Sequence, residues 1–236
     1  MQAEVFFQFL NPLVFLLFAA GFFGIHAMRP TMSVFLFALS YLCGAAAFAN
    51  DILDQAGIHL IGGIAITELY AMTATLFSAA ITLRYRGRAP WRLFGAVFLA
   101  HMSLYGWIYL NLGPGWTSSI AANFGCGVIF ALGVILIRGR TQGKIDKAVF
   151  WLYVIGSVQC FVRPLALAYA VGGVNAQTYD LSLFLTVLQI VVGLCALMLG
   201  TALLVSLSRE IFSDLEQQSV TDRLSGILNR RGFEVA

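Results

Sequence analysis

The stretch LQIVVGLCALMLGTALLVSL, residues 188–207, contains no charged residue. At 1.5 Å per residue, a helix of this length matches the roughly 30 Å hydrocarbon core of a bilayer. Its residues do not alternate between apolar and polar, as those of a membrane β-barrel strand do. The stretch therefore predicts a membrane-spanning α-helix.

Six other apolar stretches of similar length precede this one. The chain has 236 residues, of which 60% are hydrophobic and 11% charged. Soluble domains are about 25% charged, so these few charges are too few for a water-exposed surface. We expect an all-α integral membrane protein, a seven-transmembrane helix bundle in a lipid bilayer. The predicted spans are residues 5–25, 32–48, 58–83, 91–112, 117–137, 148–171 and 181–207.

Positive charge is confined to one side of this predicted bundle. Of the 14 Lys and Arg residues, all but Arg163 lie around the connections after the first, third and fifth spans or after the seventh span. The connections after the second, fourth and sixth spans contain none. Because Lys and Arg are retained on the cytoplasmic side, the pattern predicts an external N-terminus and a cytoplasmic C-terminus.

The seventh span continues without Gly or Pro as far as Val220. Leu204, Leu207, Ile211 and Leu215 recur at intervals of three and four, which is typical of a helix with one apolar face. We expect residues 208–220 to form a cytoplasmic signalling helix. It is either a short parallel coiled coil between two copies or an ordinary amphipathic extension.

A polar segment with a recognisable motif follows this helix. Residues 221–233 read TDRLSGILNRRGF and resemble the opening of a GGDEF domain, the catalytic domain of diguanylate cyclases. That family begins with a pattern close to T-D-x-L-T-G-L-x-N-R-R-x-F. The matching residues are Thr221, Asp222, Leu224, Gly226, Asn229, Arg230, Arg231 and Phe233. Ser225 and Ile227 are mild departures, and residues 221–236 are interpreted as the truncated start of such a domain.

The resemblance implies a function for the membrane part. Residues 1–207 are similar in plan to the membrane sensor modules of bacterial GGDEF proteins. We therefore expect a receptor in the bacterial cytoplasmic membrane that controls the synthesis of c-di-GMP from two GTP molecules in a homodimer. The coupling residues that we assign are Leu207, Ile211, Leu215, Asp222, Asn229 and Arg230.

The catalytic elements of that family would lie beyond Ala236. We expect no cyclase activity, catalytic residue, metal site or cofactor in this chain, and no nucleic-acid partner. GTP and Mg²⁺ would belong to the missing domain. An intact downstream motif would indicate a cyclase, and a degenerate one a c-di-GMP-binding or scaffold role.

Ionisable residues inside the predicted spans mark a candidate ligand site. Such residues are costly in lipid and usually face the bundle interior. Glu68 and Arg163 lie at similar predicted depths, roughly 12–15 Å below the outer surface. We expect them to pair for packing or to bind a small amphiphilic, lipid-like or anionic ligand; proton or ion chemistry is a further alternative. The other candidate residues are Tyr70, His101, Tyr105, Asn123, Gln159 and Gln189.

Two other classes of protein stay open. One is a structural membrane anchor that dimerises a cyclase or a degenerate c-di-GMP-binding domain. Such an anchor has no need of buried charge. The other is a transporter-like seven-helix protein, which would show internal repeats and paired broken helices; neither is evident in the sequence.

Overall fold

The computed structural model describes residues 2–170 and 181–220, and over these ranges it contains seven α-helices and no β-strand. All seven helices are long and apolar enough to cross a membrane. The predicted helical class and number of helices are thereby confirmed. The helices are α1 (Gln2–Met28), α2 (Met32–Gln55), α3 (Gly63–Arg86), α4 (Trp91–Leu112), α5 (Trp116–Ile137), α6 (Gly143–Ala170) and α7 (Leu181–Val220).

Predicted boundaries differ from the structure on both sides of the α2–α3 connection and at α6, which begins at Gly143, five residues before its predicted start. The helix α2 continues seven residues beyond the predicted end at residue 48, because neither Gly nor Pro interrupts it before Gly57. That glycine has a φ of +80°, a left-handed conformation that glycine adopts at little cost. The helix α3 begins only at Gly63, five residues after its predicted start.

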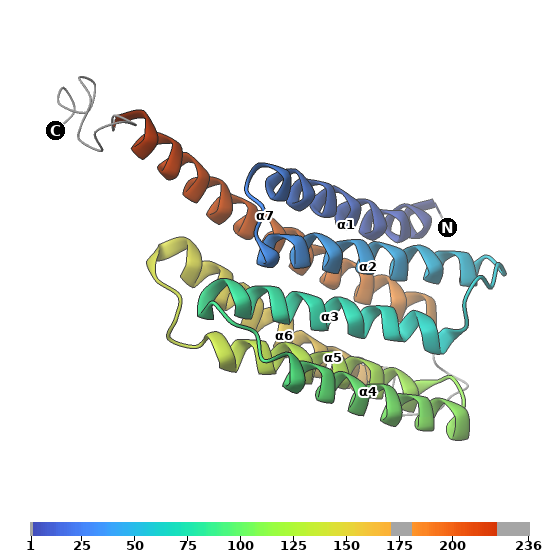
Figure 1. Cartoon of the computed structure of the whole chain (residues 1–236). Helices are drawn as coiled ribbons and strands as arrows, with labels where there is room; N and C mark the ends of the chain where they lie inside the picture. The colour runs from blue at the N-terminus through green and yellow to red at the C-terminus, as the bar shows by residue number, and fades with distance from the viewer. Residues whose placement is uncertain (1, 171–180, 221–236) are drawn as a thin grey trace.

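Six of the helices form a closed ring, in which each contacts its two neighbours in the order α1, α2, α3, α5, α6, α7. The helix α4 lies outside this ring against α3 and α5 (Figure 1). Its outer surface is correspondingly apolar and exposed, as at Leu99, Leu104 and Leu110. Such a surface suits lipid better than water.

The core of the ring is built from aromatic side chains. Phe37 and Tyr153 both pack on Phe77, with ring centroids 5.2 and 5.5 Å apart. Two tyrosine hydroxyl groups within this core are paired: Tyr153 with Ser78 at 2.7 Å, and Tyr41 with the carbonyl oxygen of Ala196 at 2.9 Å. The core therefore buries large apolar groups without leaving these hydroxyls unsatisfied.

The helix α7 packs closely against α1 through glycines. A β-carbon at Gly200 would lie 2.7 Å from the ring of Phe18, and one at Gly193 would overlap the side chain of Asn11. Small residues of this kind let helix backbones approach in apolar surroundings.

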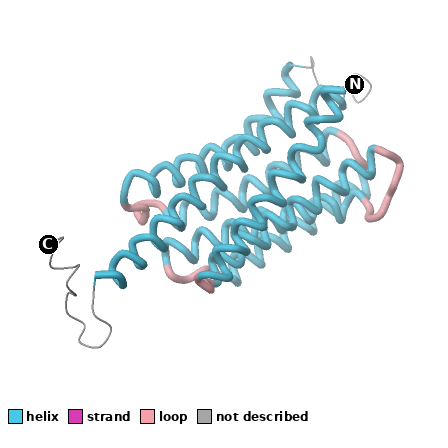
Figure 2. The backbone as a smooth tube through the Cα atoms, turned by 90° about the horizontal axis from the view of Figure 1, so that it is seen from above, coloured by secondary structure: helices cyan, strands magenta, loops and turns pink. Residues whose placement is uncertain are grey.

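Beyond these contacts, α7 extends past the ends of the other helices. The predicted seventh span and the predicted signalling helix form this one helix of 40 residues. Figures 1 and 2 both show its C-terminal part projecting from the bundle, at the end opposite the chain's N-terminus. The resembling segment 221–233 lies outside the described residues.

Candidate functional site

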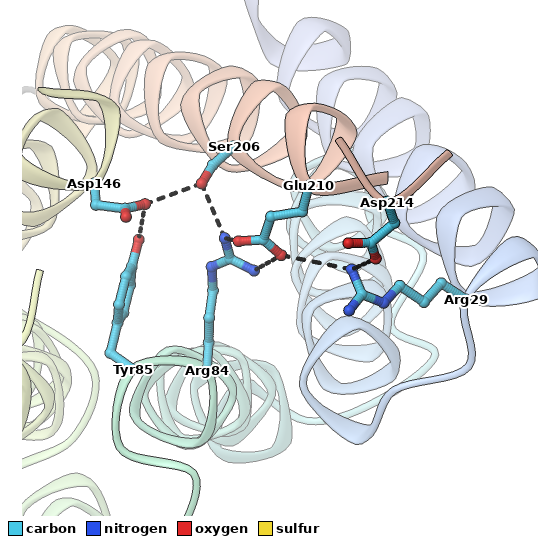
Figure 3. Close-up of polar contacts among 7 residues, drawn as sticks. All are labelled: Arg29, Arg84, Tyr85, Asp146, Ser206, Glu210 and Asp214. Atoms are coloured by element: carbon cyan, nitrogen blue, oxygen red, sulfur yellow. Dashed lines mark hydrogen bonds and ion pairs between the residues drawn. The ribbon is translucent and has the colours of Figure 1, made fainter. Parts of the chain in front are cut away.

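Polar side chains gather in two places along the bundle. One set, the exit cluster, lies where α7 leaves its neighbours. The other, the distal group, lies toward the opposite helix ends. The exit cluster consists of Arg29, Arg84, Tyr85, Asp146, Ser206, Glu210 and Asp214 (Figure 3). The distal group consists of Asp51, Thr67, Glu68, Tyr70, His101, Tyr105, Asn123 and Arg163.

Within the distal group, His101 and Tyr105 of α4 face the ring. Tyr105 accepts a hydrogen bond from Thr67 of α3 at 2.9 Å, and its ring stacks on that of His101 at 6.0 Å. His101 is buried against Gly125 of α5, where a β-carbon would lie 2.8 Å from the imidazole Cγ. The imidazole Nε2 has no hydrogen-bond partner in the described part of the chain.

Glu68 follows Thr67 on α3 and is only 9% exposed. Neither of its carboxylate oxygens has a hydrogen-bond partner among the described residues. An unsatisfied buried polar group is uncommon in folded proteins and calls for an explanation, such as a bound water, ion or ligand.

The expected Glu68–Arg163 pair is not formed. Arg163 of α6 instead donates a hydrogen bond to Asn123 of α5. The helix α5 packs against both α3 and α6, and its Asn123 accepts the hydrogen bond from Arg163. Glu68 also lies closer to the start of its helix than expected, about 7.5 Å at 1.5 Å per residue, because α3 begins at Gly63.

The remaining predicted ligand residues do not share one contact network. Tyr70 donates a 2.5 Å hydrogen bond to Asp51 of α2. The amide nitrogen of Gln159 contacts the sulfur of Cys160, while its Oε1 lacks a partner within the described ranges. The side chain of Gln189 lies outside the described residues. Asp51 was missed because it was assigned to a loop; the absence of a helix breaker before Gly57 was the available signal.

In the exit cluster, Arg84 of α3 holds Glu210 of α7 with both terminal nitrogens. The distances are 3.3 Å from Nη1 and 2.5 Å from Nη2, and Nη2 also donates to Ser206 Oγ at 2.9 Å. The Arg84 side chain is 9% exposed, whereas that of Glu210 is 48% exposed. A two-point contact of this type fixes orientation as well as distance.

Asp146 near the start of α6 extends the cluster to a third helix. One of its carboxylate oxygens accepts hydrogen bonds from the Tyr85 hydroxyl and from Ser206 Oγ, both at 3.0 Å. Ser206 thus accepts a bond from Arg84 and donates one to Asp146. The hydroxyl links α3, α6 and α7 (Figure 3).

Arg29, in the connection between α1 and α2, completes the cluster. Its Nη1 lies 3.0 Å from Asp214 Oδ2 and 4.0 Å from Glu210 Oε2. Ser206, Glu210 and Asp214 are four residues apart, so they share one face of α7. Through that face, α7 is held by three other parts of the bundle, and a rotation of α7 would break these contacts together.

The predicted coupling residues are divided between two surfaces of α7. Leu207 is buried in the core, and Ile211 lines a small cavity beside Arg84. Leu215 is 52% exposed. Leu207 and Ile211 therefore face this chain's own bundle. Asp222, Asn229 and Arg230 lie outside the described residues.

The charged residues of the exit cluster are visible in the sequence, but we did not predict that they bind one another. Arg29 and Arg84 were interpreted only as determinants of membrane orientation. Glu210 and Asp214, which lie one helical turn apart after an apolar span, were the partners that those arginines required.

No protein-family model, no curated protein and no solved structure matches this chain. The class of protein is therefore defined by the fold alone: an all-α chain whose seven apolar helices suggest a multi-pass membrane protein. The GGDEF resemblance of residues 221–233 stays a prediction.

Proposed function

We propose that this chain is the sensor and coupling part of a bacterial membrane receptor that controls a C-terminal diguanylate cyclase. Residues 1–207 would lie in the cytoplasmic membrane with the N-terminus outside. The helix α7 would carry the signal to a GGDEF domain that begins near residue 221. In such a receptor, the arrangement of the bundle sets the orientation of α7, and α7 sets the arrangement of two cyclase domains.

The observation that carries this proposal is the exit cluster. A helix that only tethers a domain needs no specific contact where it leaves the membrane. Here α7 is continuous through that point, and Arg84, Ser206 and Asp146 join it to α3 and α6. A change in the packing of α3 or α6 would therefore be transmitted to the projecting part of α7 through directed hydrogen bonds.

The orientation is supported by the charges near the exit cluster. The helix α3 ends in Arg84 and Arg86, and Arg138 and Arg140 follow α5. These residues occupy the end of the bundle from which α7 projects, and retention of positive charge on the cytoplasmic side would place that end inside the cell.

A ligand site in the outer half is supported by two unsatisfied side chains. Glu68 and His101 both bury atoms without a hydrogen-bond partner in the described residues, and the ring of Tyr105 stacks on that of His101. This chemistry favours a small polar or amphiphilic ligand with hydrogen-bond donors for the carboxylate. Arg163 has a side-chain partner in Asn123, which makes a purely anionic ligand held by Arg163 less well supported.

The proposal is tested with the chain continued through its downstream region. Membranes carrying Glu210→Ala and Asp214→Ala together would be assayed for conversion of GTP to c-di-GMP. Arg209→Gln, an exposed change on the same helix, is the matched control. We expect the double variant to shift basal activity several-fold while the control does not. Equal activity in the wild type, the double variant and the control would contradict control through the exit cluster. An absence of c-di-GMP synthesis in all three proteins would contradict the cyclase assignment.

A further inference from the structure

A small cavity lies beside the exit cluster, between the α1–α2 connection, the end of α3 and α7. Its volume is about 170 Å³, enough for roughly five water molecules at about 30 Å³ each. Val34, Leu83 and Leu207 supply an apolar wall, and Arg29 and Arg84 supply two guanidinium groups. The cavity is thus of a size for a small polar group and not for a large ligand.

The first turn of α2 also lines this cavity, through Thr31, Ser33 and Val34. Thr31 is the N-cap residue, yet its side chain makes no capping hydrogen bond, and the first turn contains no acidic residue. The first N–H groups of a helix have no partner within the helix, and its N-terminus carries partial positive charge. This end of the 24-residue helix is therefore open to an anion.

Two buried polar atoms of the lining residues are also unsatisfied. Thr31 Oγ1 and Arg84 Nε have no hydrogen-bond partner in the described residues. The Arg84 side chain is only 9% exposed. Unused donors at a polar cavity are satisfied by water or by a ligand. Because Thr31 both caps the helix and lines the cavity, its unused hydroxyl points to a missing acceptor group there.

The charges of the cavity wall select the ligand. Arg29 and Arg84 line the cavity, and each is paired with a carboxylate of α7, Arg29 with Asp214 and Arg84 with Glu210. An oxyanion that binds these arginines therefore takes the place of one of the two carboxylates. Arg guanidinium groups and a helix N-terminus together favour phosphate-class oxyanions.

We propose that this cavity binds a phosphate-class oxyanion, held by Arg29, Arg84, the Thr31 hydroxyl and the first turn of α2. The phosphate belongs either to the headgroup of an anionic phospholipid or to a free phosphate. A bound oxyanion competes with Glu210 and Asp214 for the two arginines and so loosens α7 from the bundle. The binding itself does not depend on the proposed receptor function, whereas its effect on signalling does.

Binding is measured on the purified chain by native mass spectrometry with phosphatidylglycerol, and separately by thermal stability in phosphatidylcholine nanodiscs titrated with inorganic phosphate. The variants are Arg29→Gln and the nearly isosteric Thr31→Val, which preserves packing if the loss of an arginine disturbs the fold. Arg138→Gln, an exposed change after α5, controls for the loss of positive charge. Phosphatidylcholine is the zwitterionic reference lipid.

We expect phosphatidylglycerol or phosphate to bind the wild-type chain and the Arg138→Gln control alike. Arg29→Gln should weaken binding about tenfold, the loss of one charge-assisted hydrogen bond, and Thr31→Val should weaken it by a smaller factor. Binding of phosphatidylglycerol without any stabilisation by inorganic phosphate identifies the lipid headgroup as the source of the phosphate group. Stabilisation by inorganic phosphate in phosphatidylcholine nanodiscs identifies the free anion. The site would be overturned if the chain bound phosphatidylglycerol no better than phosphatidylcholine and phosphate did not change its thermal stability. It would also be overturned if Arg29→Gln and Arg138→Gln weakened binding equally. Neither assay reads cyclase activity, so this failure is distinct from failure of the receptor proposal.

Discussion

Arg84 of α3 and Glu210 of α7 are joined by two hydrogen bonds, although 126 positions separate them in the sequence. Arg84 is nearly buried and Glu210 is half-exposed, so the pair lies where the bundle meets its surroundings. The arginine cannot move to water without leaving the core, and the carboxylate moves with α7. Whether the pair is formed therefore depends on the position of α7 relative to the bundle.

This relationship predicts a coupling energy between the two side chains. Glu210→Gln leaves the buried guanidinium without its counter-charge, and Arg84→Gln leaves a carboxylate that water can still reach. We expect each change to destabilise the chain by about 1–3 kcal/mol, with the double variant costing less than the sum by about 1 kcal/mol. Thermal or denaturant unfolding in detergent measures the cycle. Strict additivity would show that the two groups do not interact in solution.

The opposite result is expected for Glu68 and Arg163. Because the Glu68 oxygens have no hydrogen-bond partner among the described residues and Arg163 bonds to Asn123, the cycle of Glu68→Gln and Arg163→Gln should be additive within about 0.5 kcal/mol. Glu68→Gln alone removes an unsatisfied buried charge and should leave stability unchanged or raise it. Arg163→Gln should lower stability, because it removes the bond to Asn123. A coupling energy above about 1 kcal/mol would show that Glu68 and Arg163 interact directly.

The contact between His101 and Gly125 predicts a steric effect. Gly125→Ala places a methyl group inside the imidazole ring volume, and we expect a loss of about 1–3 kcal/mol. Gly106→Ala in α4 has open space around its β-carbon, and should be neutral or stabilise by up to about 1 kcal/mol. The unfolding midpoints of the two variants give the comparison. His101→Ala should rescue Gly125→Ala, and a failure to rescue would mean that another neighbour sets the limit at Gly125.

The membrane orientation predicts which loops a reagent can reach. In a background without its four cysteines, an impermeant maleimide should label Ala56→Cys in intact cells and Arg88→Cys only after permeabilisation. Both positions are exposed and lie in connections at opposite ends of the bundle. The reverse pattern would invert the proposed orientation and place the exit cluster outside the cell.

The sequence predicted the helices better than it predicted which helices contact each other. The apolar run of residues 188–207 and six others specified seven spanning helices, because length and hydropathy are local properties. Which helices touch is not local. The order of the helices around the ring follows from packing of the whole bundle, and it makes Asn123 of α5 a partner of Arg163.

The exit cluster illustrates the same limit at single residues. The sequence placed Arg84 and Glu210 near one membrane surface, but not opposite each other. The apolar periodicity of Leu207 and Ile211 correctly predicted one face of a helix, but it did not indicate which surface covers that face. It is the chain's own bundle, including the cavity beside Arg84.

The most direct test of the central claim is cyclase activity as a function of inserted length in α7. One to four alanines would be inserted between Leu215 and Glu216, beyond the exit cluster, in the chain continued through its downstream region. Each residue rotates the following segment by about 100°, so the bundle contacts stay intact while the output domain turns. We expect c-di-GMP synthesis to fall and rise with insertion length and to recover in part with four residues. Activity that stays constant through the whole series would show that α7 is a passive tether and would contradict the proposed receptor mechanism.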